Sequence, residues 1–210
     1  MGLFGILKSV LGGGGNTPGN RVYRNRMAEY KGLRQRIVDS SPDSRIWILA
    51  HFVASLDEAA KALEVMQLAH RAATRPEELQ FAPQDRLIIA TTNVLLNAST
   101  LPQQPSPPTQ ILITEHYPTP GKDAQLVEIL QAHAPEAEIQ FYVNLDEPFF
   151  KAFGQNVSGV MDQVDAPEDE ALEHPLLDHA LRAAQKKIES KAKSDRPARS
   201  QEEWFELNMS

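Results

Sequence analysis

The sequence contains no cysteine among its 210 residues. This absence excludes disulfide bonds, zinc sites with thiolate ligands and catalysis by a cysteine nucleophile. It also fits a cytoplasmic location, because disulfides are rare in that compartment. The chain has no apolar run of about 18 residues, the length that a helix needs to cross a bilayer. We therefore expect a cytoplasmic protein without a membrane-spanning segment.

Positive charge is scarce as well. Lysine and arginine number 21 against 28 aspartate and glutamate residues, which gives a formal net charge of -7 at pH 7. A protein with this balance offers no broad basic surface, so we expect no nucleic-acid partner. The hydrophobic fraction of 41% and the charged fraction of 23% are typical of a folded globular domain. A chain of this length suits one domain with tails.

Residues 1–20 combine an apolar segment with a glycine-rich tether at 12–20. On a helix the apolar residues share one face and could insert shallowly into a membrane surface. A secretory signal is not expected, because the start is not basic and glycines follow the short apolar centre. A frayed tail or a partner-docking turn is the alternative. The possible membrane contacts are Leu3, Phe4, Ile6, Leu7, Lys8, Val10 and Leu11.

From residue 21 to residue 145, predicted strands alternate with predicted helices. Residues 21–38 repeat apolar side chains at helical spacing, among them Met27 and Val38. Ser55 and Glu58 have the spacing of a capping box that opens a second helix. This alternation predicts an α/β fold, with a parallel sheet that is covered by helices on both faces. The predicted strands are residues 45–53, 86–92, 110–116 and 138–145, and a third helix covers residues 122–132.

The remainder of the chain shows helical patterns only. Short helices are expected at 148–153 and 157–164, followed by an acidic loop at 165–173. Pro175 then opens a long helix, since proline is favoured at the first helical position. A charged tail completes the chain. The apolar stripe of the long helix is Leu177, Leu181, Ala184 and Ile188, and the residues of the tail that could dock are Trp204, Phe205 and Leu207.

Two segments of this region resemble the SecA preprotein translocase family. They are LDEPFFKAFG at 145–154 and EALEHPLLDHALRAAQKKIE at 170–189. In SecA a similar order occurs where the second RecA-like motor domain ends and the scaffold helix begins. The resemblance continues in collinear order from about residue 21 to residue 190. The scaffold-helix motif here comprises Glu173, His174, Pro175, Gln185 and Lys187.

The resemblance also implies a division of the chain and a nucleotide-facing side. Residues 1–20 would be the amphipathic segment and linker, 21–165 a degenerate second RecA-type domain, and 166–210 a scaffold-helix remnant with the charged tail. The fold implied is a RecA-like parallel sheet followed by a long C-terminal scaffold-type helix. IIATTNV and ITEHYPTPGKDAQL are similar to nucleotide-facing segments of SecA. The remnants they carry are Thr91, Asn93, Thr114, Glu115, Asp123 and Gln125.

The chemistry of the motor is missing from this sequence. ATP hydrolysis needs a phosphate-binding loop with its lysine and arginines that stabilise charge on the transferred phosphoryl group. The chain has neither a G-x-x-x-x-G-K-[ST] loop nor a D-E-A-D-type segment. The family's arginine-rich stretch is replaced by QLVEILQAHAP at 125–135, which contains no arginine. We therefore expect no enzymatic activity, no cofactor and no metal.

These departures lead to a functional prediction that rests on the resemblance. The chain is expected to be a non-catalytic, SecA-derived interaction module, accessory or regulatory in protein export at the cytoplasmic face of the membrane. Its partners would be proteins, namely a SecA-type motor, the export channel or a preprotein, with peripheral membrane contact through the N-terminal segment. The alternative is half of a split ATPase, completed in trans by a separate nucleotide-binding lobe.

Several histidines and basic residues, some of them within these motifs, have an ordinary structural explanation and a rival functional one. His51, Glu115 and His116 follow predicted strands, where a metal or hydrolase site is conceivable, although histidines at strand ends are common. His174 is interpreted as a helix-start residue. A basic run at the end of the long helix is either a solvated face or a contact for an acidic partner or lipid. It comprises Arg182, Lys186, Lys187, Lys191, Lys193 and Arg196.

Overall fold

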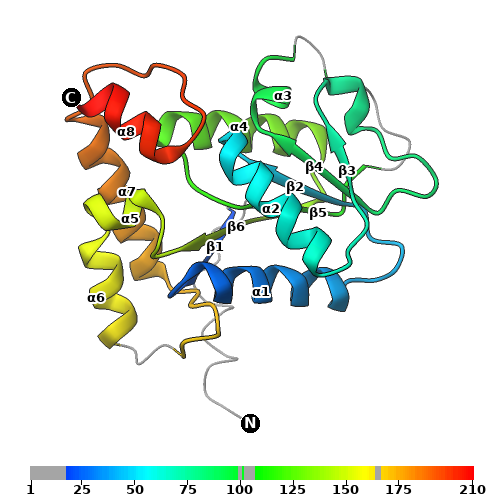
Figure 1. The fold of residues 1–210 in the computed structure, drawn as a ribbon, viewed down its shortest axis with the longest axis horizontal. Coiled ribbons are helices and arrows are strands. Elements are labelled where there is room, and N and C mark those ends of the chain that lie inside the picture. Colours follow the sequence, from blue (N-terminus) through cyan, green and yellow to red (C-terminus); the bar gives the residue numbers. More distant parts are fainter. Residues whose placement is uncertain (1–17, 99–100, 102–106, 164–166) are drawn as a thin grey trace.

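The computed structural model describes residues 18–98, 101, 107–163 and 167–210 (Figure 1). The possible membrane contacts between Leu3 and Leu11 lie outside the described residues. Within the described residues, none of the helices is long and apolar enough to cross a membrane.

Six parallel strands form one sheet, with the order β1-β6-β5-β2-β4-β3. The predicted parallel α/β fold is therefore confirmed. The strands are β1 (Gly19–Tyr23), β2 (Ile46–Ala50), β3 (Arg71–Ala73), β4 (Leu87–Thr91), β5 (Gln110–Ile113) and β6 (Glu138–Asn144).

Helices cover both faces of this sheet (Figure 1). One face carries α1 (Arg26–Asp39) and α2 (Val53–Val65), and the other carries α4 (Pro120–His133). The remaining helices are η3 (Pro76–Leu79), α3 (Asn93–Leu96), α5 (Pro148–Phe153), α6 (Gln155–Gln163), α7 (Pro175–Glu189) and α8 (Gln201–Met209).

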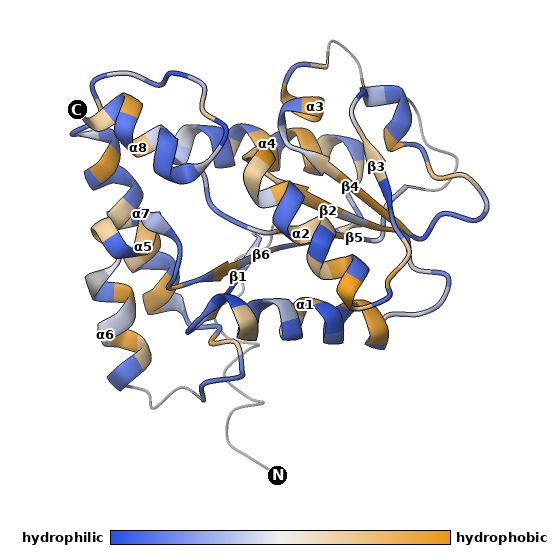
Figure 2. Ribbon diagram, in the orientation of Figure 1, coloured by the Kyte–Doolittle hydropathy of each residue, from blue (hydrophilic) through white to orange (hydrophobic). Residues whose placement is uncertain are grey.

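The central strands β2 and β4 consist mostly of hydrophobic residues (Figure 2), and their side chains are buried on both sides of the sheet. Successive side chains of a strand point to opposite faces. Ile46 and Ile48 accordingly pack under α1 and α2, whereas Trp47 and Leu49 belong to the core on the α4 side. This two-sided burial explains why β2 and β4 are nearly unbroken apolar runs in the sequence.

The first strand corrects the sequence prediction. Residues 19–23, expected as the end of a tether and the start of a helix, form β1 beside β6. Helix α1 begins only at Arg26, because the side chain of Asn25 accepts a hydrogen bond from the Ala28 amide and caps it. Two members of the predicted apolar stripe, Met27 and Val38, are 67% and 50% exposed. The short edge strand β3 was also missed by the prediction.

The predicted capping box at Ser55 is wrong. The N-cap of helix α2 is Phe52, three residues before Ser55, and it has no side-chain cap. The Ser55 hydroxyl instead donates to Glu115 at 2.7 Å, and Glu58 pairs with Arg26. Ser55 and Glu58 therefore do not cap α2; each instead contacts a residue that is distant in the sequence.

The helix that opens at Pro175 is confirmed, with His174 as its N-cap through a hydrogen bond from the Leu176 amide. Its apolar stripe is buried as predicted. However, α7 has 15 residues and packs against α4, α5, α6 and β1. That it corresponds to a long scaffold helix stays a prediction. The tail docks through the fully buried Trp204 of α8, with Phe205 and Leu207 half-buried.

Candidate functional site

Polar residues gather where the central strands end. His51 follows β2, Thr92 follows β4, and Thr114, Glu115 and His116 follow β5. Open α/β sheets bind their ligands at the carboxyl ends of the strands. This end of the sheet is therefore the candidate site.

Asp123, in the first turns of α4, is the centre of a buried network. Its Oδ1 accepts from the His51 Nε2 at 2.8 Å and from the Tyr117 amide at 3.0 Å. Its Oδ2 accepts from the His116 Nδ1 at 2.7 Å and from the Gln185 Nε2 at 2.6 Å. Burial alone would raise the pKa of Asp123, but the adjacent His116 and His51 outweigh burial and hold this pKa well below its usual range.

The second nitrogen of each histidine also has a partner. The His51 Nδ1 lies 3.0 Å from the Thr92 hydroxyl, and the His116 Nε2 lies 2.8 Å from the Asn20 Oδ1. The amide nitrogen of Asn20 donates to Asp178 at 2.7 Å, which fixes the orientation of that amide. Neither ring therefore has a free nitrogen for a metal ion or a substrate proton.

The metal or hydrolase hypothesis for His51, Glu115 and His116 thus gains no support from the geometry. The Glu115 carboxylate points to α2, where it accepts from the Phe52 amide at 3.0 Å and from Ser55. Among the described residues, no group of three or more histidine or acidic side chains could hold a metal ion.

Two further carboxyls, Glu29 and Glu147, are buried behind Glu115. Both accept hydrogen bonds from the side chain of Asn144. Burial raises the pKa of Glu29 to about 8 and raises the pKa of Glu147 well above its usual range. Burial also raises the pKa of Glu115. The cause is desolvation, because burial disfavours the charged form of each carboxyl.

The segment from residue 195 to α8 closes over the strand ends. The Tyr117 hydroxyl and the Trp204 Nε1 both donate to Asp195 Oδ1, at 2.6 and 2.9 Å. The Gln201 side chain donates to the His116 carbonyl oxygen at 3.2 Å and accepts from the Phe149 amide at 2.8 Å. The C-terminal segment therefore occupies hydrogen-bonding groups that a ligand at this edge would need.

A pocket of about 350 Å³ remains beside this closure. His51 and Thr92 form part of its lining, with Asn93, Lys122 and Asp195 around them. Among the residues that line the pocket, Lys122 is the one lysine or arginine. A polyphosphate carries several negative charges, and sites that bind one supply several cations or backbone amides.

The predicted nucleotide-face residues separate into two groups. Thr114, Glu115 and Asp123 are buried, but only Asp123 belongs to the network. The Thr114 hydroxyl donates to the Leu49 carbonyl oxygen at 3.3 Å. Thr91 is half-buried, and Asn93 and Gln125 are exposed outside the network.

The residues of the scaffold-helix motif also lie in different places in the structure. Gln185 joins the network through Asp123 and donates to the Tyr117 carbonyl oxygen at 2.9 Å. Glu173 lies 3.2 Å from Arg21, Pro175 is the first residue of α7, and Lys187 lies over the ring of Phe153. Sequence reasoning did not single out five residues of the site. Thr92 and Tyr117 lie within the segments similar to SecA, whereas Asn20, Asp195 and Gln201 are single polar residues without a motif.

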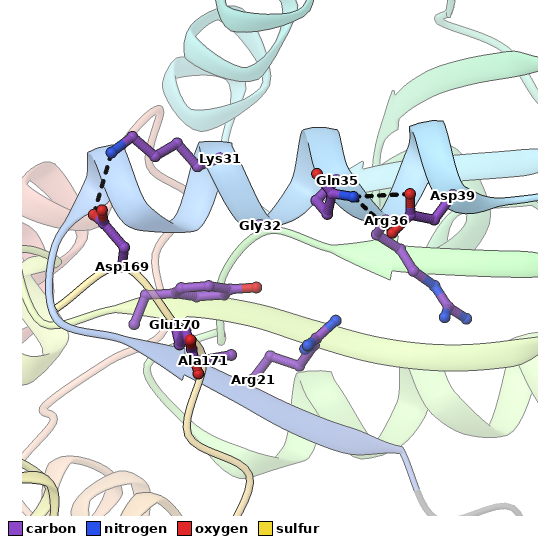
Figure 3. Close-up of a pocket in the computed structure, with 10 residues that line it drawn as sticks. Arg21, Lys31, Gly32, Gln35, Arg36, Asp39, Asp169, Glu170 and Ala171 are labelled. Atoms are coloured by element: carbon purple, nitrogen blue, oxygen red, sulfur yellow. Dashed lines mark hydrogen bonds and ion pairs between the residues drawn. The ribbon is translucent and has the colours of Figure 1, made fainter. Parts of the chain in front are cut away.

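A separate charged cleft of about 500 Å³ lies between α1 and the loop before α7 (Figure 3). Lys31 pairs with Asp169 across it at 3.2 Å, and Gln35 donates to Asp39 on the same helix at 2.8 Å. Arg36 is paired with Glu138. Each lysine or arginine that lines the cleft in the described residues therefore has an acidic partner, including Arg21, which pairs with Glu173.

Comparison with known proteins gives partial matches. No protein-family profile matches the chain. Two solved structures are similar, at low sequence identity. The C-terminal part of the Fun30 ATPase domain has a TM-score of 0.42 and 13% identity, covering 80% of this chain and 57% of that one. The C-terminal domain of a possible DNA helicase from Lactobacillus plantarum has a TM-score of 0.41 and 14% identity, covering 60% and 73%.

In sequence, parts of the chain are similar to SecA proteins. SecA of Dechloromonas aromatica is 42% identical over 53 residues, which are 25% of this chain and 6% of that protein. SecA of Syntrophomonas wolfei is 33% identical over 82 residues, covering 39% and 10%, and SecA 1 of Clostridioides difficile is 32% identical over 82 residues, covering 39% and 9%. The chain thus spans 6% to 10% of the length of these relatives, and over these segments its predicted resemblance to SecA is confirmed.

Proposed function

We propose that this chain is a non-catalytic interaction module, related to SecA, that acts as an accessory or regulator of protein export. The relatives named above are protein translocase subunits, which motivates a role in translocation. The proposed partners are proteins, namely a SecA-type motor, the export channel or a preprotein. No cofactor or nucleic acid is part of the proposal.

One observation carries the non-catalytic part of the proposal. The side chains at the ligand-binding end of the sheet are hydrogen-bonded to one another, with Asp123 accepting four hydrogen bonds from its own chain. A phosphoryl-transfer site needs donors and cations that face the nucleotide instead. Here Gln185 and Gln201, from α7 and α8, lie among those groups. This arrangement supports a binding role over ATP hydrolysis.

An ATPase assay combined with a binding assay tests the proposal. We expect the purified full chain to release no phosphate from ATP, and to bind a SecA-type motor from the same source and change that motor's preprotein-stimulated ATPase rate. Phosphate release by the chain alone, abolished in Lys122→Ala, would overturn the non-catalytic assignment. Failure to bind the motor, the channel and a preprotein would overturn the export role.

The ATPase assay also distinguishes the proposal from the split-motor alternative. That alternative requires new ATPase activity when the chain is mixed with a separate nucleotide-binding lobe. Because no arginine lines the pocket beside His51 and Lys122, and a missing arginine finger costs about a thousandfold or more in rate, we expect no such activity. Stimulated hydrolysis in the mixture would favour the split motor.

The proposed location is the cytoplasm, with peripheral attachment to the membrane through the apolar N-terminal segment, whose possible contacts lie between Leu3 and Leu11. Apolar amphipathic segments bind a bilayer by burying one face in the interface. Flotation of the full chain with vesicles of 30% phosphatidylglycerol tests this proposal, with a chain that lacks residues 2–17 as the control. Equal flotation of both chains would contradict the assignment of the membrane contact to this segment.

A further inference from the structure

Two lysines without an acidic partner converge on one aromatic ring. The Nζ atoms of Lys187, in the last turn of α7, and of Lys191, just after α7, lie 5.8 and 5.5 Å from the ring centroid of Phe153. Both lysines are exposed. Phe205 of α8 stacks on Phe153 with centroids 6.1 Å apart, so the ring is held in place. We call Phe153, Lys187 and Lys191 the lysine patch.

Lys187 and Lys191 belong to the cations of the described residues that have no acidic partner. In the part of the chain that the structure describes, neither Lys187 nor Lys191 forms an ion pair or a side-chain hydrogen bond to a carboxylate. Seven other cations do form ion pairs with aspartate or glutamate. These are Arg21, Arg24, Arg26, Lys31, Arg36, Arg71 and Arg75.

The face of an aromatic ring attracts each ammonium group, but the two ammonium groups repel each other. A negative group placed between them would remove this repulsion and form two charge-assisted hydrogen bonds. The C-terminal end of α7 stabilises nearby cations, yet its dipole does not neutralise their charge. The patch is thus a local reversal of sign on a protein whose formal net charge is -7.

We propose that the lysine patch is a docking surface for an acidic segment of a partner protein. The inference rests on the proposed function in treating the chain as a protein-binding module, and it adds the chemistry of the segment that is bound. Carboxylates of an extended segment could reach both ammonium groups, with Phe153 as an apolar floor.

The surroundings of the patch favour an acidic segment over an anionic bilayer. Glu202 and Glu206 are exposed on α8, next to Phe205 in the helix. A flat anionic surface that covered both the patch and α8 would be repelled by these carboxylates. A narrow segment can pass beside them. Moreover, Phe153 lies under two lysines and against Phe205, which leaves little of the ring for insertion into lipid.

Binding of a fluorescein-labelled deca-glutamate peptide to the full chain, followed by anisotropy, tests the proposal. We expect Lys187→Glu/Lys191→Glu to weaken binding about tenfold or more, because both favourable contacts become repulsive. The matched control is Arg34→Glu/Lys61→Glu, on α1 and α2, where both residues are exposed. It changes the net charge by the same amount and should bind within about twofold of the parent chain. A urea midpoint for each variant establishes that it is folded.

Phe153→Leu tests the contribution of the aromatic ring to binding independently of the two lysine charges. It keeps an apolar side chain on Phe205 but removes the aromatic face, and we expect peptide binding to weaken about threefold. Equal losses in the two charge-reversal variants, or no binding of the peptide to the parent chain, would overturn the proposal. Patch-dependent binding to vesicles of 30% phosphatidylglycerol without binding of the peptide would assign the surface to lipid. Peptide binding by a chain that binds neither a SecA-type motor, nor the export channel, nor a preprotein would leave the patch standing and refute the export role.

Discussion

Asp123 and Gln185 meet at the end of the sheet, where the Gln185 Nε2 donates to the Asp123 Oδ2 at 2.6 Å. This bond joins α4, which carries Asp123, to α7, which carries Gln185. In sequence the two residues belong to different motifs, one on the expected nucleotide face and one in the expected scaffold helix. In the folded chain they are parts of one hydrogen-bond network.

Replacing Asp123 with asparagine tests how much this network stabilises the fold. The amide group would turn one acceptor oxygen into a donor that faces other donors, among them His51 and His116. We expect the free energy of unfolding to fall by about 2 to 4 kcal/mol. Urea denaturation, followed by circular dichroism, measures the change.

Asp57→Asn is the matched control, because Asp57 is exposed on α2. Its effect on the free energy of unfolding should stay within about 0.5 kcal/mol. Similar effects of the two substitutions would mean that the buried network contributes little.

The buried Glu29 predicts a loss of stability at alkaline pH. Its folded-state pKa, about 8, lies above the value of an unfolded glutamate, so the folded state holds its proton more tightly. Its contribution to stability is fully present below about pH 4.5 and is lost as pH rises through about 8. Glu147, with a raised pKa as well, acts in the same direction. Urea midpoints should therefore fall between pH 5 and pH 9.

Glu29→Gln isolates this effect, because glutamine stays neutral and can still accept from Asn144. We expect its midpoint to depend less on pH over the same range than that of the parent chain. Glu64→Gln, exposed on α2, should keep the parent dependence. An unchanged slope in Glu29→Gln would show that Glu29 is ionised in the folded chain.

Two helical glycines should respond to alanine with opposite signs. A Cβ at Gly32 would lie 2.1 Å from the Tyr23 hydroxyl oxygen and 2.5 Å from the adjacent ring carbon. We expect Gly32→Ala to destabilise by about 1 to 3 kcal/mol, because overpacking outweighs the better helix propensity of alanine. A Cβ at Gly159 meets nothing within 4 Å. Gly159→Ala should therefore stabilise by about 0.5 to 1 kcal/mol.

Thermal unfolding of the two glycine variants measures both changes. Gly121→Ala, also with nothing within 4 Å of the added Cβ, gives a second open position. A destabilised Gly159→Ala together with a neutral Gly32→Ala would contradict the packing of Tyr23 against α1.

The pattern of hydrophobic residues in the sequence predicted the fold well where both faces of an element are buried. The inner strands β2, β4 and β5 are nearly unbroken apolar runs, and a pattern of that kind has few alternatives between turns. Edge strands are different. Residues 19–23 have a polar first half and lie at the margin of the sheet, so their pairing with β6 depends on the whole fold.

The candidate site was only partly predictable for a similar reason. Asp123 and Gln185 were identified through a family resemblance, and His51 and His116 through their place after strands. Nothing local in the sequence indicates that Asn20 would bond to His116, since 96 positions separate the two residues. Contacts of this kind arise from topology, which a one-dimensional pattern does not contain.

Asp195 holds α8 in place over the ends of the strands. Tyr117 and Trp204 both donate to Asp195, and the Trp204 side chain is fully buried. Asp195→Ala removes the shared acceptor and leaves the buried indole N–H unpaired, at a cost of about 1 to 3 kcal/mol. That cost falls on the docking of α8, so we expect faster hydrogen exchange of the α8 amides, measured by mass spectrometry.

Asp43→Ala, in an exposed loop before β2, controls for the loss of a carboxylate elsewhere and should leave exchange in α8 unchanged. Because Gln201 of α8 bonds to the His116 carbonyl oxygen, an opening of α8 should also accelerate exchange in residues 114–117. Faster exchange in α8 alone would mean that the helix and the strand ends move independently, and the closure would then not protect this edge of the sheet from ligands.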